Sequence, residues 1–188
     1  MAGRGVALEE AEQYLDPTLR TLLPNPSSFK DMDKAAGRIA AAIEGKEKIA
    51  VFGDYDVDGA TSSGLLKRFF NAIGVPVIIY IPDRMKEGYG PNAAAMDKLK
   101  SQGIDLVITA DCGIVSFDVL SHAKEIGLEV IVVDHHQAET RLPDAVAVIN
   151  PKRHDESQKF TYLAAVGVTF LLVVAVNRAL REAGWYNE

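Results

Sequence analysis

Five short hydrophobic runs alternate along this chain with longer stretches of helical periodicity, and this alternation limits the folds open to it. The runs read as buried strands and lie near residues 49–53, 77–81, 106–110, 129–133 and 146–149. Helices are expected near residues 60–73, 92–102, 116–126 and 161–183. The sequence therefore predicts an α/β fold with right-handed crossovers, in which helices cover both faces of a mainly parallel five-stranded sheet.

The segment before the first strand has a different character. Residues 1–28 are expected to form an arm, because three prolines interrupt any long helix: Pro17, Pro24 and Pro26. Residues 31–43 follow with apolar side chains at helical spacing, which predicts a helix. We therefore divide the chain into an N-terminal arm and helix, 1–45, and a main domain, 46–188. The sequence stops just after a helix, so we expect the main domain to be truncated at its C-terminus.

Composition limits the classes of protein that this chain can represent. It has 188 residues, 48% hydrophobic side chains and a net charge of −6. A negative net charge argues against a nucleic-acid binder that depends on bulk electrostatics, although bound cations would reverse the sign locally. The single cysteine, Cys112, excludes an internal disulfide and fits a reducing cytoplasm. The longest hydrophobic stretch, 163–176, is too short to span a bilayer, and no export signal is visible, so we expect a cytoplasmic protein without a membrane partner.

Polar clusters follow three of the predicted strands. The first is the acidic segment 53–59, the second is Asp111 with its neighbours, and the third is the run Asp134-His135-His136. Because the carboxyl ends of parallel strands lie along one edge of a sheet, we expect these side chains to converge there. Carboxylates together with imidazole suit Mn²⁺ or Mg²⁺, and a pair of such ions is suited to cleaving phosphoesters.

In the first cluster, Asp54, Asp56 and Asp58 are spaced by two residues between a strand and a helix. Three carboxylates this close repel one another strongly unless cations neutralise them. An acidic N-cap for the following helix is the alternative, and it explains one or two of the three. We expect a turn at Gly59 to gather the three side chains into a compact set of metal ligands.

The second and third clusters strengthen each other. Asp111 alone is weak evidence, because an aspartate at a strand end often caps the next helix. His135 and His136 are consecutive, so one imidazole can ligate a metal while the other faces substrate. A chance pair of surface histidines is the alternative reading; His122 and His154 illustrate that background.

Three motifs carry a resemblance to a known family. The segments GDYDVDGATS at 53–62, DCG at 111–113 and VVDHHQ at 132–137, in this order, resemble the DHH phosphoesterase superfamily. The chain is most similar to the N-terminal portion of the RecJ branch, whose first motif has this form, and the segment PDRMKEGYG at 82–90 also fits that branch. The resemblance implies a Mn²⁺- or Mg²⁺-dependent exonuclease that degrades single-stranded DNA from 5′ to 3′ in repair and recombination. It also implies single-strand-binding protein and a repair helicase as partners.

The resemblance assigns roles to residues of the three motifs. It implies four metal ligands, which are Asp56, Asp58, Asp111 and His135. Asp111 would bridge two ions, Asp54 would be an auxiliary acid beside them, and His136 would contact the scissile phosphate. We therefore expect Asp54, Asp111 and His136 to take part in catalysis, in which the ions would lower the pKa of a water molecule for attack on phosphorus.

The segment 82–90 supplies candidates for substrate binding. Arg84 would hold a phosphate, although a solvated loop arginine explains it equally well. Gly88 and Gly90 would let a tight loop approach the nucleic-acid backbone. Tyr89 would stack on a base, or alternatively anchor the loop to the domain.

The chain departs from the family pattern in two ways. Phe52 stands where many superfamily members have a histidine ligand, four residues before Asp56. A later Gly-rich motif, which supplies a further aspartate in the family, does not occur before Glu188. We also expect the chain to lack the second domain that clamps DNA in the RecJ branch. We therefore expect the 188-residue chain to be inactive by itself.

Three other functions remain open. The segment 56–59 imitates the nucleophile motif of haloacid-dehalogenase-type hydrolases, which would form a covalent aspartyl-phosphate but would leave His135 and His136 without a role. Another DHH enzyme would act on short oligonucleotides, cyclic dinucleotides or pyrophosphate. A non-catalytic DHH scaffold in replication would have lost ligand residues, most of which are present here.

Overall fold

The five hydrophobic runs form one sheet. The structure is a computed structural model and describes residue 3 and residues 5–187. Its strands are β1 (Ile49–Gly53), β2 (Val77–Tyr80), β3 (Leu106–Ala110), β4 (Glu129–Val133) and β5 (Ala147–Ile149). They pair in the order β2-β1-β3-β4-β5, and every pair is parallel. The predicted five-stranded parallel sheet is confirmed.

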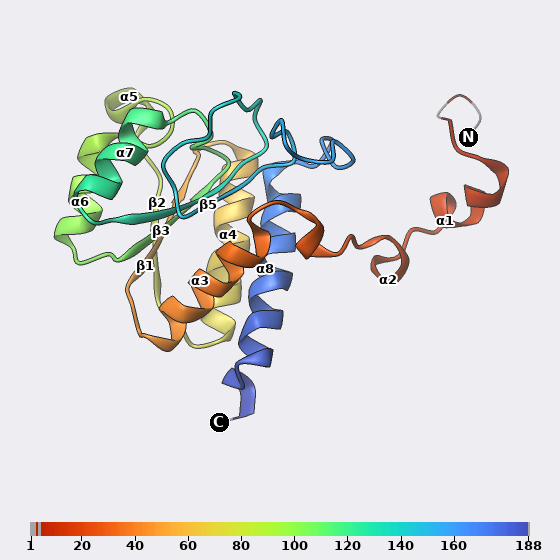
Figure 1. Cartoon of the computed structure of the whole chain (residues 1–188), viewed down its shortest axis with the longest axis horizontal. Coiled ribbons are helices and arrows are strands. Elements are labelled where there is room, and N and C mark those ends of the chain that lie inside the picture. The colour runs from red at the N-terminus through yellow and green to blue at the C-terminus, as the bar shows by residue number, and fades with distance from the viewer. Residues whose placement is uncertain (1–2, 4, 188) are drawn as a thin grey trace.

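Helices cover both faces of the sheet, as expected for crossovers of one hand (Figure 1). On one face lie α3 (Met32–Glu44), α4 (Val57–Ala72) and α8 (Ala165–Glu182). On the other face lie α6 (Ala93–Ser101) and α7 (Phe117–Glu125). A single helical turn, α5 (Arg84–Glu87), follows β2 and was not predicted. The helices α4 and α8 lie side by side with their N-terminal ends at the same edge of the sheet (Figure 1).

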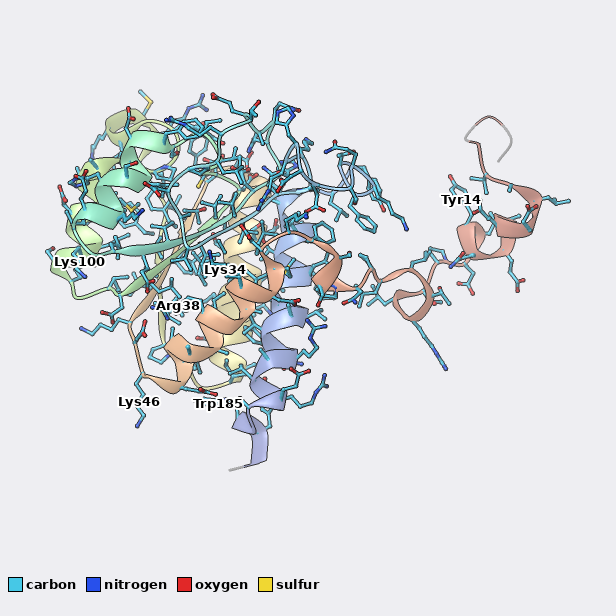
Figure 2. All side chains as sticks on the ribbon, in the orientation of Figure 1. Tyr14, Lys34, Arg38, Lys46, Lys100 and Trp185 are labelled. Carbon is cyan, nitrogen blue, oxygen red and sulfur yellow. The ribbon has the colours of Figure 1, made fainter. Side chains whose placement is uncertain are left out.

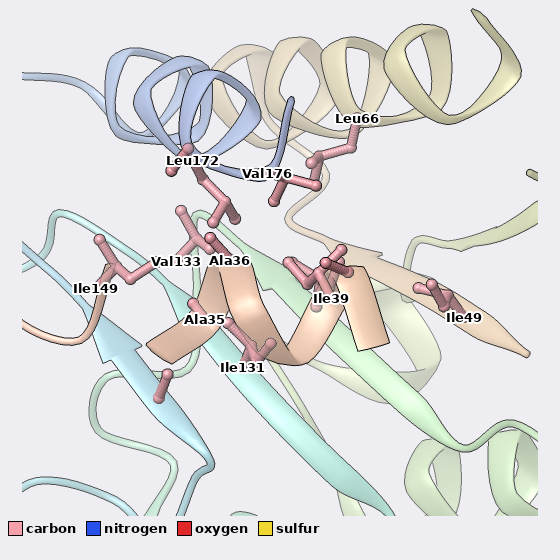
Figure 3. Packing of buried hydrophobic residues seen from close by; sticks show 14 of the residues in the cluster. Ala35, Ala36, Ile39, Ile49, Leu66, Ile131, Val133, Ile149, Leu172 and Val176 are labelled. Carbon is pink, nitrogen blue, oxygen red and sulfur yellow. The ribbon is translucent and has the colours of Figure 1, made fainter. Parts of the chain in front are cut away.

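The larger core lies beneath α3, α4 and α8 (Figure 3). Ala35, Ala36 and Ile39 of α3 are buried, and the two alanines let the helix lie close to the sheet. Leu172 and Val176 of α8 point into the same cluster (Figure 3). Burying whole aliphatic side chains in this way stabilises the fold by about 1.5–3 kcal/mol each. The strands that lead to the carboxyl edge of the sheet are therefore packed against a hydrophobic core.

The expected N-terminal arm is present and extends away from the sheet (Figure 1). Its short helices are α1 (Ala11–Leu15) and α2 (Leu19–Leu22), with single 3₁₀ turns at Leu8–Glu10 and Pro26–Ser28. The prolines at 17 and 24 separate these pieces, because proline cannot continue a helix. Tyr14 lies on this arm, far from the sheet, and is exposed (Figure 2).

Two helix boundaries differ from the sequence prediction. The helix α4 begins at Val57 rather than near residue 60, so Gly59 lies inside the helix and the expected turn at Gly59 is wrong. The physical reason is the Asp56 carboxylate, which caps the helix by accepting from the backbone N–H groups of Asp58 and Gly59. The helix α8 begins at Ala165 rather than near residue 161.

Two further expectations concern a membrane span and the boundary between domains. Within residues 5–187, no helix has the length and apolar character needed to cross a membrane. The helix α3, which lies before the expected boundary at residue 45, contacts both α8 and β5 of the expected main domain. The division of the chain into two domains at residue 45 stays a prediction.

Candidate metal centre at the carboxyl edge of the sheet

The register of the sheet brings the polar clusters into one row. Gly53 pairs with Ala110, Ala110 with Val133, and Val133 with Ile149, so four strands end level. The next residue of each strand extends the ladder by one more bond: the backbone N–H groups of Asp54, Asp111 and Asp134 donate to the carbonyls of Ala110, Val133 and Ile149. Three buried aspartates therefore stand side by side at the carboxyl edge, as the sequence predicted.

Asp111 is the centre of this row. Its carboxylate belongs to two groups of possible ligand atoms that each lie within 4.8 Å of one another, one with His135 and His136 and one with Asp54 and Asp56. The backbone of Asp111 has a φ of 65°, in the left-handed region that few residues other than glycine, asparagine and aspartate adopt. This conformation turns the chain sharply at the end of β3. The turn keeps Asp111 within the row.

The electrostatic environment of Asp111 is unfavourable to its charge. The side chain is 1% exposed, and its Oδ1 atom has no hydrogen-bond partner among the described residues. Burial is the main cause that raises the pKa of Asp111 to about 8, followed by the charge of Asp58 and then by the side chain of Asp56, through a hydrogen bond and its charge. A buried carboxylate oxygen without a partner is costly, and a cation is the group that would relieve it.

The first acidic segment does not form the compact set that the sequence predicted. Asp54 is buried, which raises its pKa, and its Oδ1 atom accepts from the Tyr55 N–H. Asp56 caps α4, and the N–H of Gly59 is the main cause of its lowered pKa. Asp58 lies one residue inside α4 and faces α8 instead of its two neighbours. Asp54 and Asp56 therefore join Asp111 in one group of possible ligand atoms, and Asp58 lies on the side of α8.

The two oxygens of Asp58 are both held by the backbone of α8. Its Oδ2 atom accepts from the N–H of Ala165 and its Oδ1 atom from that of Val166, each at 2.8 Å. The same Oδ2 atom lies 3.5 Å from the Nε2 atom of His135. This places Asp58 beside the histidine pair.

Asp134 organises the histidine pair, and sequence reasoning gave it no role. Its carboxylate accepts from the backbone N–H groups of Ile114, His135 and His136, at 3.0, 2.7 and 3.1 Å. It also accepts from the Nδ1 atom of the His136 ring at 2.7 Å. Burial alone would raise the pKa of Asp134, but these hydrogen bonds outweigh it and lower the pKa. An aspartate directly before two histidines was the available signal, because such side chains commonly bond backbone N–H groups one or two residues ahead.

The two imidazoles point in different directions, as their adjacent positions predicted. His135 directs its Nε2 atom toward Asp58 and Asp111, at 3.5 and 3.4 Å. His136 is more exposed, with 46% of its side chain open to solvent, and its Nδ1 atom lies 3.9 Å from Asp111. The bond to Asp134 raises the pKa of His136. One imidazole therefore faces the carboxylates, and the other borders the open side of the site.

The predicted substrate-binding loop lies next to this centre. Gly88 and Gly90 have φ values of 80° and 73°, so both use the conformation that glycine permits. Tyr89 is 54% exposed, and its hydroxyl donates to the carbonyl of Asp111 at 3.4 Å. The guanidinium of Arg84 lies over the ring of Tyr55, 4.9 Å from its centroid. Tyr89 thus anchors the loop through its hydroxyl while much of its surface stays open.

Two neighbouring side chains are structural. Phe52 is fully buried and stacks on Tyr80, with 5.3 Å between ring centroids. Cys112 is buried, which raises its pKa, and its thiol faces the carbonyls of Phe52 and Ala110. A neutral thiol is a poor ligand for Mn²⁺ or Mg²⁺.

The donor set fits a hard divalent cation. Carboxylate oxygens and a neutral imidazole nitrogen are ligands that Mn²⁺ accepts, and the unpartnered Oδ1 atom of Asp111 lies between them. The fit rests on this buried oxygen, because crowded carboxylates alone also occur on protein surfaces without a metal.

Comparison with known proteins assigns the family. The model of the DHH family, N-terminal domain, matches residues 48–186. The chain belongs to the DHH family. The match begins just before β1 and runs through α8, so it includes all three motifs of the carboxyl edge.

Relatives within the DHH family are RecJ proteins. The single-stranded-DNA-specific exonuclease RecJ of Bacillus subtilis is 44% identical over 152 residues, which are 81% of this chain and 19% of that protein. The RecJ of Salmonella typhimurium is 38% identical over 188 residues, which are 100% of this chain and 32% of that protein. This chain therefore spans less than two thirds of the length of either relative. Its resemblance to the RecJ branch is confirmed.

A solved structure shows the same likeness in three dimensions. The crystal structure of exonuclease RecJ bound to manganese superposes with a TM-score of 0.72 at 35% identity. The match covers 81% of this chain and 38% of that one. The DHH fold predicted from the motifs is therefore confirmed.

Proposed function

We propose that this chain is the metal-binding part of a 5′-to-3′ exonuclease that hydrolyses the phosphodiester bonds of single-stranded DNA. The observation that carries the proposal is the buried, unpartnered Oδ1 atom of Asp111, placed between two histidines and two further aspartates. Support for the substrate comes from the likeness to RecJ proteins, which are named as single-stranded-DNA-specific exonucleases. Repair and recombination are the processes in which we expect it to act.

The proposed metal ligands are Asp56, Asp58, Asp111 and His135, and Asp111 would hold ions together with both groups of its neighbours. Manganese is the ion of the similar RecJ crystal structure, and we propose Mn²⁺ or Mg²⁺ for this chain. When bound, such ions supply a lowered water pKa and neutralise charge on the phosphoryl oxygens.

The chain's own side chains orient and recognise the substrate. His136 is held by Asp134 and borders the open side of the centre, where it would donate to a phosphate oxygen. Asp54 is buried beside Asp111 and would act as an auxiliary acid. Tyr89 exposes a ring on which an unpaired base can stack, and Gly88 and Gly90 keep its loop narrow. Arg84 would hold a phosphate beside Tyr55.

The test is single-turnover cleavage of 5′-labelled single-stranded DNA with Mn²⁺. It uses a form of the protein as long as its relatives, because this chain spans only 19% and 32% of the two described above. We expect Asp111→Ala to lower the rate by at least about 100-fold, since even residues that merely support a metal ligand cost 10–100-fold when mutated. Asp16→Ala, the same change on the exposed arm, is the control and should leave the rate unchanged. An unchanged rate in Asp111→Ala would overturn the proposal.

Further parts of the proposal follow from the same family likeness. We expect single-strand-binding protein and a repair helicase as partners and a cytoplasmic location, with a domain boundary near residue 45. Comparing long single-stranded DNA with short oligonucleotides, cyclic dinucleotides and pyrophosphate would separate the proposed activity from that of other DHH enzymes. Family membership favours these hydrolases over the haloacid-dehalogenase type.

A further inference from the structure

The first turn of α8 and the two residues before it contact two of the proposed metal ligands, although α8 begins more than 100 residues after one of them in sequence. Ala165 and Val166 are the first two residues of α8, and their N–H groups bind the two oxygens of Asp58. The first N–H groups of a helix have no partner within the helix, and the helix dipole favours a negative charge there. Two parallel bonds to one carboxylate fix its plane as well as its position.

The residue two positions before the helix holds His135. The Nδ1 atom of the His135 ring lies 3.1 Å from the carbonyl oxygen of Leu163. Because a carbonyl oxygen only accepts hydrogen bonds, the proton must be on Nδ1. In the neutral ring the Nε2 atom then carries a lone pair, and it points toward Asp58 and Asp111 at 3.5 and 3.4 Å. This tautomer is the one that can ligate a metal through Nε2.

The turn itself is held in place by packing. The side chain of Leu163 packs against the larger core, and a Cβ atom at Gly167 would lie only 3.3 Å from its Cδ2 atom. Val168 and Leu171, in the next turn of α8, are buried in the same core. The backbone that meets Asp58 and His135 is therefore held by packing against the interior of the domain, both at Leu163 and along the start of α8.

We propose that the entry to α8, residues 163–166, which are the first two helical residues and the two before them, is a positioning element of the metal centre. Its backbone orients the Asp58 carboxylate and sets the tautomer of His135, so that both would present lone pairs to an ion held at Asp111. This inference rests on the proposed function, and it adds four residues at the entry to a distant helix to the residues that position the metal ligands. Their backbone groups bind the side chains of Asp58 and His135, so their role is positioning.

Proline at position 165 isolates this role. Proline is well tolerated at the first position of a helix, where it lacks only an N–H group that the helix does not use. Ala164 has φ and ψ of −71° and 163°, the extended conformation that a following proline requires. Ala165→Pro thus removes the bond to Asp58 Oδ2 and leaves the helix able to form. We expect it to weaken Mn²⁺ binding to the 188-residue chain at least tenfold, measured by calorimetry with Mn²⁺ alone.

Ala93→Pro is the matched control, because Ala93 is the first residue of α6 and is exposed. It should bind Mn²⁺ as the wild type does. If Ala165→Pro folds and also binds Mn²⁺ with wild-type affinity, the positioning proposal fails while the proposed function stands. If the wild-type chain itself binds no Mn²⁺, it is the proposed metal centre that fails.

A measurement on the wild-type chain tests the proposal even if Ala165→Pro does not fold. Nitrogen-15 shifts of the His135 ring, recorded without metal at a pH where the ring is neutral, report which nitrogen carries the proton. We expect protonation at Nδ1, and slow hydrogen exchange at the Ala165 and Val166 amides compared with the first amides of α6. Protonation at Nε2, or equally fast exchange in both helices, would overturn the positioning role.

Discussion

Asp111 and Asp134 begin from the same position in the fold and reach opposite electrostatic states. Each follows the end of a central strand, each continues the ladder by one bond, and each side chain is 1% exposed. Asp134 accepts hydrogen bonds from two backbone N–H groups of the histidine pair, from Ile114 and from the His136 ring, and its pKa is lowered. Asp111 has an oxygen with no partner in the described part of the chain, and its pKa is raised to about 8.

This difference shows how burial and hydrogen bonding together determine the pKa values of two neighbouring carboxylates. Burial raises the pKa of both residues, but the negative charges of Asp58 and Asp56 raise that of Asp111 further, whereas hydrogen bonds and the charge of His136 lower that of Asp134. The satisfied carboxylate of Asp134 orders the protein around it. The carboxylate of Asp111, which has an oxygen without a hydrogen-bond partner, is left able to bind a cation.

The largest expected effect on stability comes from removing the carboxylate of Asp134, whose hydrogen bonds are complete. Asp134→Ala leaves the buried N–H of Ile114 without its acceptor and frees the His136 ring, so we expect the free energy of unfolding to fall by about 3 kcal/mol. Chemical denaturation of the apo chain measures this change. Asp16→Ala is the control. A loss no larger than in that control would show that the two strand-end aspartates do not differ in structural role.

The next effect concerns Asp111 and the stabilisation of the chain by Mn²⁺. Mn²⁺ at 100 times its dissociation constant should stabilise the wild-type chain by about 2.7 kcal/mol. Asp111→Asn removes the charge that the ion would neutralise, so we expect this gain to disappear. Thermal melts with and without Mn²⁺ measure it, and an equal gain in the variant would contradict the contrast between Asp111 and Asp134.

The pH dependence of stability sharpens the comparison further. The ordinary pKa of an aspartate is 3.8, and that of Asp111 in the fold is about 8. Between these values the unfolded chain has released the proton that the folded chain still holds, so folding takes up a proton and rising pH lowers the free energy of unfolding. Stability from this residue is therefore fully present below about pH 4 and lost as pH rises toward 8.

Asp111→Asn should flatten this decline in apo chain, because the amide does not titrate. We expect a smaller effect than for Asp134→Ala, since solvent reaches the half-exposed His136 beside the site and screens its charges. Denaturation at pH 5 and pH 8 measures the slope in wild type, Asp111→Asn and Asp16→Asn. Parallel slopes in all three would show that the burial of Asp111 does not govern its proton.

The smallest effect tests whether Tyr89 stabilises the turn at Asp111. Tyr89→Phe removes a hydroxyl that donates to the Asp111 carbonyl at 3.4 Å, and we expect a loss of about 0.5 kcal/mol in stability. The ring that is proposed to stack on DNA is kept. A drop in DNA affinity in this variant without a change in stability would assign the hydroxyl to substrate instead.

Local pattern predicted the sheet accurately. The run Leu106–Ala110 was placed to the residue, because a short hydrophobic segment between polar ends has few other structures open to it. Since parallel strands end at one edge, the meeting of Asp111 with His135 and His136 could also be predicted. The sequence pattern did not predict the start of α4, because three aspartates at alternate positions resemble one set of metal ligands. In the structure Asp56 caps the helix and Asp58 lies inside it.

Contacts between distant elements could not be predicted. The bonds from Ala165 and Val166 to Asp58 depend on how α8 crosses α4, which no local pattern of either segment records. The bond from His135 to Leu163 depends on the same crossing. Sequence therefore indicated which side chains meet, and tertiary packing decides how each of them is held.

The left-handed backbone at Asp111 restricts what this position can become. With a φ of 65°, most side chains there would strain the chain, so the fold by itself admits mainly glycine, asparagine or aspartate. Glycine and asparagine would keep the shape but carry no charge for a cation. Any residue at position 111 must therefore meet two independent requirements. It must adopt a positive φ, and it must carry a charge for a cation; aspartate meets both.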